Sequence, residues 1–214
     1  LLSVAEDGTR WIVKDWYADR ECNLKDSKEV LCAIEQIACL HKILRGIEFK
    51  EEWNLGSILV QQPAEEMERH NKELVRARSF IRNKRKKSEF ELCVMGNYDT
   101  FYEQAMEACI GMAGFLENRE IREEYLCHGD LNQHHILMCA HNVAIVEFNR
   151  MHKGMQMEDL YHFMRKAMEK HDWNLKLGMA MLDAYSDILP LSDADRTCLY
   201  YLFLSLIHIS EPTR

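Results

Sequence analysis

The stretch that decides the fold is His128-Gly129-Asp130-Leu131-Asn132-Gln133-His134-His135-Ile136-Leu137. The short apolar run 125–127 precedes it and its own last residues are apolar, so we expect a loop held between two short strands. A further strand is predicted over 143–148, and it carries Glu147, 17 residues after Asp130. Two acids on neighbouring β-turns can converge on one point, and this loop is therefore the candidate site.

Paired carboxylates in this arrangement suit phosphoryl transfer. One carboxylate orients the attacking hydroxyl group, and the other holds Mg²⁺ against the phosphate oxygens. Asp130 is accordingly the candidate catalytic base, and the alternative is an ordinary loop acid that accepts hydrogen bonds from backbone N–H groups. For His128 we expect hydrogen bonds to nearby backbone rather than a role as general base.

The same loop resembles the HGDxNQHNxL loop of the bacterial spore-coat CotS family, which belongs to the aminoglycoside and choline phosphotransferase branch of the kinase-like fold. Four further stretches agree with that family in the same order: 11–16 with 20–22, 38–41, 78–87 and 158–166. The resemblance covers roughly residues 1–204. It implies an α+β, protein-kinase-like fold of the aminoglycoside phosphotransferase type, made mostly of the helical large lobe with a remnant of the small β-lobe.

The resemblance also divides the chain. Residues 1–24 would be the end of the small lobe and the hinge, and 25–204 the large lobe with its catalytic-type loop at 128–149. Residues 205–214 resemble translated adapter sequence and are expected to be a non-native tail. The strand that bears the nucleotide-binding lysine would lie upstream of Leu1. Three hinge residues are the candidate nucleotide contacts, with ATP and Mg²⁺ as candidate cofactors: Asp15, Trp16 and Tyr17.

Two residues depart from the pattern of the phosphotransferases. His135 stands where they place a metal-binding Asn, and Glu147 where they place an Asp. The extra methylene of Glu moves the carboxylate by about 1.5 Å, and imidazole is a poor ligand for Mg²⁺, which demands octahedral oxygen coordination. A displacement near 1 Å can cost about 10²-fold in rate. His135 and Glu147 are therefore the metal candidates of a degenerate site, and the alternative is an active ATP-dependent phosphotransferase of small molecules or proteins that uses Asp130 as base.

The resemblance to the spore-coat family also implies a cellular role for the protein. It implies a binding or scaffold component of spore-coat assembly, made in the mother-cell cytoplasm and then moved to the spore coat, with other coat proteins as partners. In related phosphotransferases an Asp comparable to Asp159 ties a helix start to the catalytic loop. The alternative for Asp159 is an ordinary acid at a helix N-terminus.

Charge and hydropathy exclude two classes of binding partner. The 214 residues carry a formal net charge of −8, which argues against non-specific coating of nucleic acid. The longest apolar stretch, 199–207, is interrupted by Ser205 and is too short to span a bilayer. We therefore expect neither a nucleic acid nor a membrane as partner. The acid-free basic run 76–87 is either a solvated helix face or, by the resemblance, a docking site for an acidic coat partner.

Periodicity and capping residues predict the other elements. A hairpin over residues 1–4 and 10–15 turns at Asp7-Gly8, and a polar connector follows over 17–25. Helices are expected over about 27–44, from about 64, and over about 97–117, 158–170, 174–188 and from 192. Asp26 or Ser27 would cap the first of these helices. Ser192 and Asp195 form a capping-box pattern at the start of the last one.

Overall fold

The computed structural model describes residues 2–12, 16–48, 50, 52, 63–118, 124–140 and 142–205. Most of these residues are helical: α1 (Ser27–Arg45), α2 (Pro63–Asn83), α3 (Glu89–Glu117), α4 (Gln156–Lys170), α5 (Leu175–Ser186) and α6 (Asp193–Leu204). The strands are short and pair antiparallel: β1 (Leu2–Val4) with β2 (Arg10–Ile12), β3 (Arg20–Glu21) with β5 (Ile136–Met138), β5 with β6 (Val143–Ile145), and β4 (Tyr125–Cys127) with β7 (His152–Gly154). Two 3₁₀ turns, η3 (Gln133–His135) and η4 (Phe148–Arg150), complete the described elements.

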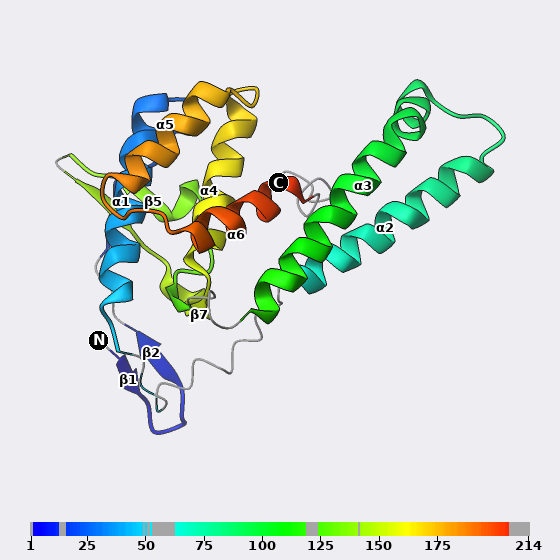
Figure 1. Cartoon of the computed structure of the whole chain (residues 1–214). Coiled ribbons are helices and arrows are strands. Elements are labelled where there is room, and N and C mark those ends of the chain that lie inside the picture. Colours follow the sequence, from blue (N-terminus) through cyan, green and yellow to red (C-terminus); the bar gives the residue numbers. More distant parts are fainter. Residues whose placement is uncertain are drawn as a thin grey trace.

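The main core lies where α1, α4, α5 and α6 pack together (Figure 1). The apolar face predicted for α1 is buried as expected, and Ile34, Ile37 and His41 have no exposed surface. From α4 and α5, Phe163 and Tyr185 enter the same core. Side chains of this size each contribute about 1.5–3 kcal/mol when fully buried. This rigid helical block is the support on which the candidate loop rests.

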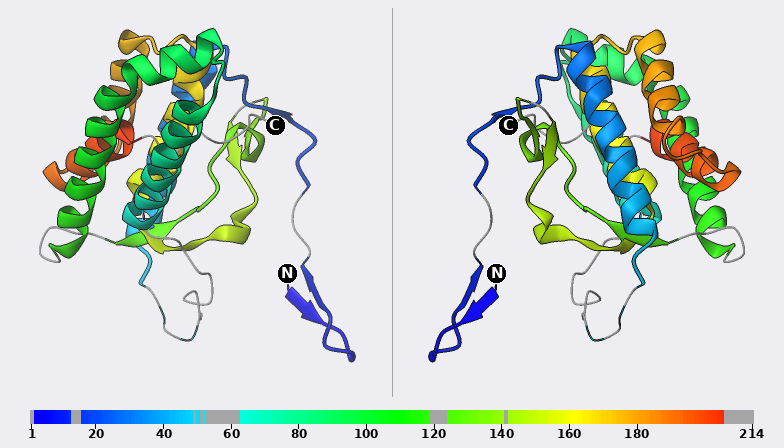
Figure 2. Two further views of the ribbon diagram at one scale, coloured as in Figure 1. Left: turned by 90° about the vertical axis from the view of Figure 1, so that its right-hand side faces the viewer. Right: turned by 90° about the vertical axis from the view of Figure 1, so that its left-hand side faces the viewer.

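The small sheets fix both ends of that loop. β4 leads into the loop and β7 follows it, and their pairing places Cys127 opposite His152. β5 and β6 form the hairpin inside it, with Leu137 opposite Ala144. β3 joins the outer edge of that hairpin, so that Arg20 lies opposite Met138 and the connector after the hinge runs beside the loop. The β1–β2 hairpin, with Gly8 at φ 83° in its turn as predicted, lies apart from the helices in both side views (Figure 2).

Helices α2 and α3 form a long hairpin that extends away from the core (Figure 1). The C-terminal part of α3 joins the body, where it packs on α6, and Met67 near the start of α2 belongs to the same core. A Cβ atom at Gly111 would lie 2.1 Å from the ring of Tyr201, so a glycine is required for this close approach of the two helices. The other end of the hairpin, around residues 84–88, points into solvent.

Several boundaries differ from the sequence prediction. α3 begins at Glu89, well before the expected start near residue 97, because Ser88 and Glu91 form a capping box in which each bonds the backbone N–H of the other. β6 ends at Ile145, and not at Phe148, because Glu147 adopts a left-handed backbone conformation with φ 66°. β3 falls in the segment that we expected to be a connector. The caps at Asp26 and Ser192 are confirmed.

No helix in the described part of the chain combines the length and the apolar character that crossing a membrane requires.

Candidate functional site

The candidate loop turns sharply at Gly129, immediately after β4. Gly129 has φ 81°, a conformation that residues with a side chain rarely adopt. A Cβ atom there would lie 2.2 Å from the carbonyl oxygen of Arg150 at the end of η4. The two segments that carry Asp130 and Glu147 are therefore pressed together, and glycine is required by both the angle and the space.

His128 is a structural residue of the loop, as its sequence context predicted. It is fully buried, and its Nε2–H donates to the carbonyl oxygen of Val146 at 2.9 Å. Its Nδ1 accepts a hydrogen bond from the Asp130 N–H at 3.2 Å. Burial lowers the pKa of His128, which keeps the ring neutral with its proton on Nε2. The ring thus joins the start of the loop to the strand that precedes Glu147.

Asp159 binds the start of the candidate loop. The link between the loop and the start of a helix, which the resemblance implied for Asp159, is confirmed. Its carboxylate accepts from the N–H groups of His128 at 2.7 Å and Gly129 at 2.9 Å. The carboxylate is almost completely buried. Burial alone would raise the pKa of Asp159, but the interaction with His41 and the two backbone donors together lower it. Asp159 is therefore an ionised anchor at the start of α4.

A buried polar chain extends from Asp159 into the helical core. His41 Nε2 on α1 lies 3.5 Å from the Asp159 carboxylate, and His41 Nδ1 lies 2.8 Å from the hydroxyl oxygen of Tyr185 on α5. Gln156, one turn before Asp159, donates to the carbonyl oxygens of His41 and Leu126. Three helices and β4 are thus linked behind the loop. The sequence contained His41 within a matching stretch, but no local signal pointed to Tyr185 or Gln156.

Asp130 lies at the surface of the loop, with its side chain 41% exposed. One carboxylate oxygen accepts from Asn132 Nδ2 at 3.0 Å. The other lies 3.9 Å from His135 Nδ1 and 4.0 Å from Arg150 Nε. The Asp130 carboxylate is therefore accessible, but the guanidinium group of Arg150 lies beside its outer oxygen. Sequence reasoning had not singled out Arg150.

The metal candidates form a poor site for Mg²⁺. His135 donates from Nδ1 to the carbonyl oxygen of Asp130 at 2.7 Å. The only nitrogen of the ring with a lone pair free to bind a metal is therefore Nε2. Glu147 accepts from Asn149 Nδ2 at 2.5 Å. Among the described residues, no three His, Cys, Asp or Glu side chains are grouped to hold a metal ion. One imidazole nitrogen and one carboxylate do not fit the oxygen-rich octahedron that Mg²⁺ demands.

The hinge candidates can be placed only in part. Asp15 lies outside the described residues, while Trp16 is 90% exposed and Tyr17 is also exposed. The strand that follows them contacts the loop directly, because Glu21 and His134 Nδ1 lie 2.6 Å apart. Two large aromatic side chains therefore stand free of the core just before the chain reaches the loop. Their binding of nucleotide stays a prediction.

Comparison with known proteins identifies the fold. No protein-family model and no curated sequence matches the chain. Among solved structures, an aminoglycoside phosphotransferase from Alicyclobacillus acidocaldarius is 17% identical, with a TM-score of 0.75 over 95% of this chain and 60% of that one. An aminoglycoside phosphotransferase from Streptomyces rimosus (15% identity, TM-score 0.50, 87% and 65% covered) and an ethanolamine kinase from Plasmodium vivax (12%, 0.51, 95% and 57%) are also similar.

These likenesses confirm the kinase-like, aminoglycoside phosphotransferase-type α+β fold that the sequence predicted. The chain spans about 60% of the length of the first of these structures. At such low identity the likeness concerns the fold and not the reaction.

Proposed function

We propose that this protein is a spore-coat component that uses a degenerate kinase-like fold to bind and scaffold, and not to transfer phosphate. The observation that carries the second half of the proposal is Arg150 Nε at 4.0 Å from the Asp130 carboxylate. The guanidinium group beside the would-be base competes with any substrate hydroxyl group for the outer oxygen of Asp130. The resemblance of the loop and of four further stretches to the CotS family supports the coat role.

The metal chemistry points the same way. Phosphoryl transfer is mostly positioning and charge neutralisation, so it depends on correctly placed metal ions. His135 is turned toward the backbone of Asp130, and Glu147 is bonded to Asn149. A nucleotide could still bind through exposed hinge residues such as Trp16 without being turned over. ATP and Mg²⁺ are thus proposed at most as bound ligands that the protein does not turn over.

One observation favours the alternative of an active phosphotransferase. The loop is held by two buried hydrogen bonds to Asp159 and presents an accessible Asp130. Such a preorganised base is what catalysis needs. In that case Asp130 would accept the proton of the substrate hydroxyl group, and Glu147 would offer its oxygens to the metal.

Transfer of phosphate from ATP should be undetectable above background. The assay measures ATP turnover with Mg²⁺ or Mn²⁺ for the protein and for Asp130→Asn. Both should give the same rate, because the base has no productive metal site to serve. Turnover that the Asp130→Asn change abolishes would establish the enzyme and overturn the scaffold proposal.

The matched gain-of-binding variant is His135→Asn with Glu147→Asp, which restores the oxygen ligands of an active site. Mg²⁺–ATP should raise the melting temperature of this variant more than that of its parent, because selective binding to the native state stabilises it. Both substitutions alter ligands of the same metal site, so their effects on the melting-temperature shift should be non-additive. Equal shifts would mean that these positions do not limit nucleotide binding.

The coat role is tested separately in the sporulating bacterium that encodes the protein. A tagged copy should appear first in the mother cell and then in coat extracts of purified spores, with little in the spore interior. Coat extracts from cells that lack the gene should be altered in composition. A tagged protein that remains in vegetative cytoplasm would contradict the proposal, whatever the result of the turnover assay.

A further inference from the structure

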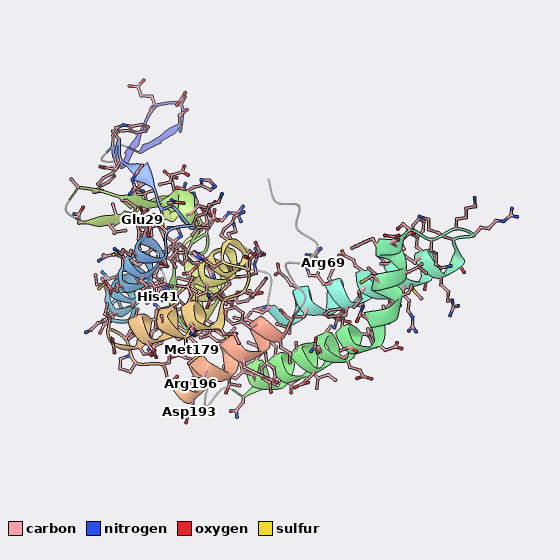
Figure 3. All side chains as sticks on the ribbon, turned by 90° about the horizontal axis from the view of Figure 1, so that it is seen from above. Glu29, His41, Arg69, Met179, Asp193 and Arg196 are labelled. Atoms are coloured by element: carbon pink, nitrogen blue, oxygen red, sulfur yellow. The ribbon has the colours of Figure 1, made fainter. Side chains whose placement is uncertain are left out.

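The far end of the α2–α3 hairpin is strongly basic. From Arg76 to Lys87 the chain has seven basic residues and no acid. Seven of the 27 basic residues therefore lie within these 12 positions, a local concentration of positive charge in a chain whose formal net charge is −8. The hairpin carries that charge well away from the core (Figure 3).

Much of this charge has no partner within the chain. Arg78 pairs with Asp99 at 3.2 Å, and Lys84 pairs with Glu91 at 2.6 Å. Four other basic residues in the run have no carboxylate within 4 Å in the described part of the chain: Arg76, Arg82, Arg85 and Lys86. Local ion pairs therefore leave a surplus of exposed cations around the turn between α2 and α3.

Large apolar side chains accompany the cations. Phe80 is 67% exposed and Phe90 is 75% exposed, one on each side of the basic turn. Grouped exposed aromatic residues on a protein surface mark binding sites more often than single ones do. We call the set Phe80, Arg82, Arg85, Lys86 and Phe90 the hairpin tip. Its chemistry calls for a partner that is both apolar and acidic.

The body of the same protein offers such a surface between α5 and α6. A groove with a cavity volume of about 390 Å³ lies there. Its walls are mainly apolar: Met179, Leu182, Leu191, Leu199, Tyr200 and Phe203. Met179 and Tyr200 are more than half exposed. The groove is thus large enough and apolar enough to receive an aromatic side chain.

Three acidic residues lie in or beside this α5/α6 groove. Asp183 lines it, and Asp187 and Asp193 flank the connection between the two helices, all three exposed. In the described residues no Lys or Arg nitrogen lies within 4 Å of these carboxylates. Arg196 is the positively charged residue among those that line the groove. Asp183 and Arg196 balance within the lining, and the exposed Asp187 and Asp193 at the adjoining helix ends leave the surface around the groove with an acidic surplus. That surplus is opposite in sign to the charge of the hairpin tip.

We propose that the hairpin tip of one copy docks into the α5/α6 groove of a second copy. Within one chain the two surfaces cannot meet, because α3 packs on α6 by its C-terminal part and the tip points away from Met179 and Arg196 (Figure 3). Phe80 or Phe90 enters the groove, and Arg85 and Lys86 lie against Asp183 and its neighbours. Burial of the exposed aromatic surface drives the association, and the charges select its orientation.

This contact joins two different surfaces, so it is heterologous. Each copy that has used its tip still offers its groove, and association continues into an open chain or closes into a ring. Growth of this kind suits a layered assembly, but the inference stands independently of the coat role and of the chemistry at Asp130.

The test measures sedimentation velocity over a series of protein concentrations at low and high salt. The protein should form species larger than a dimer, and association should weaken at high salt because exposed charges are screened. Two variants each remove one surface: Arg85→Glu with Lys86→Glu at the tip, and Met179→Lys with Asp183→Lys at the groove. Each should raise the dissociation constant by roughly tenfold or more, since like charges then face one another.

Mixing the two variants gives the decisive result. The groove of the tip variant and the tip of the groove variant are both intact, so a one-to-one mixture should associate where neither variant does so alone. The altered tip and altered groove also carry opposite charges, which favours the same association. The control variant Lys25→Glu with Lys28→Glu makes the same change in net charge on the exposed start of α1 and should associate normally. Circular dichroism checks that every variant is folded.

Four results would overturn the proposal. The first three are sedimentation as a monomer at every concentration, a control variant that weakens association as much as the tip variant does, and a mixture of the two variants that does not associate. Loss of association in the tip variant alone would show that the tip binds another surface, and this too would refute the assignment of the groove.

Discussion

Asp159→Ala should lower the free energy of unfolding by about 3–5 kcal/mol, the usual effect of removing one partner from a buried polar pair. The carboxylate is almost completely buried, and it accepts the N–H groups of His128 and Gly129. Without it, both donors lose their acceptor, and His41 Nε2 loses the group it faces. Buried polar groups that remain unpaired carry the full penalty of their desolvation.

Urea denaturation followed by circular dichroism measures this loss. Asp187→Ala is the matched control, because that side chain is exposed and makes no ion pair within the described residues, and its effect should stay within about 0.5 kcal/mol. Asp159→Asn should fall between the two, since an amide keeps one acceptor oxygen but not the charge. If Asp159→Ala cost no more than Asp187→Ala, the loop would have to be held by other contacts.

The loss should also depend on pH in a defined direction. The pKa of Asp159 is lower in the folded protein than its usual value of about 3.9. A depressed pKa contributes stability that is fully present above the unfolded value and disappears as pH falls through the folded one. The difference between parent and Asp159→Ala should therefore be constant above pH 5 or so and shrink on acidification below about pH 4. A difference that grew on acidification would contradict the assignment of an ionised anchor.

The elements that sequence predicted best are those whose signals are local. The buried face of α1 follows from apolar spacing, and the caps at Asp26 and Ser192 follow from side chains next to the backbone groups they bond. The capping box that starts α3 was equally local, and Ser88 with Glu91 could have revealed it. β3 and β7 have only two and three residues, too few to show an alternating pattern.

At the site, the sequence predicted which residues gather but not how they are oriented. The roles of His128 and Asp159 followed from the loop motif and the resemblance. The bond from His41 to Tyr185 joins residues 144 positions apart, and no local pattern encodes such a contact. Arg150 ends the 3₁₀ turn that follows Glu147, and the left-handed conformation of Glu147 is unusual for a residue with a side chain. The feature that decides the proposed function was therefore visible only in three dimensions.

Gly129→Ala should have the second large effect, a loss of about 3 kcal/mol or more of unfolding free energy. Alanine at φ 81° is strained by about 1–2 kcal/mol wherever it occurs. Its Cβ would in addition lie 2.2 Å from the carbonyl oxygen of Arg150 and 2.8 Å from His152 Nδ1. The carbonyl belongs to the backbone and cannot rotate away, so the loop and η4 must separate.

Gly8→Ala is the control that isolates this clash. Gly8 has nearly the same backbone angle, φ 83°, but a Cβ atom there meets nothing within 4 Å. Its substitution should therefore show the conformational cost alone, at most about 2 kcal/mol. The difference between the two variants, measured by urea denaturation, reports the contact between the Gly129 loop and the segment that carries Arg150.

The same difference bears on function. If Gly129→Ala separates the two segments, the guanidinium of Arg150 moves away from Asp130. The NMR resonance of the Asp130 carboxyl carbon should then change at constant pH, because the charged neighbour is gone. The same resonance in Gly8→Ala should match that of the parent. Equal losses of stability for the two glycine variants, with no change at Asp130, would mean that this contact does not hold Arg150 in place. The argument that Arg150 occupies the outer oxygen of Asp130 would then fail, and an active phosphotransferase would become the better interpretation of the loop.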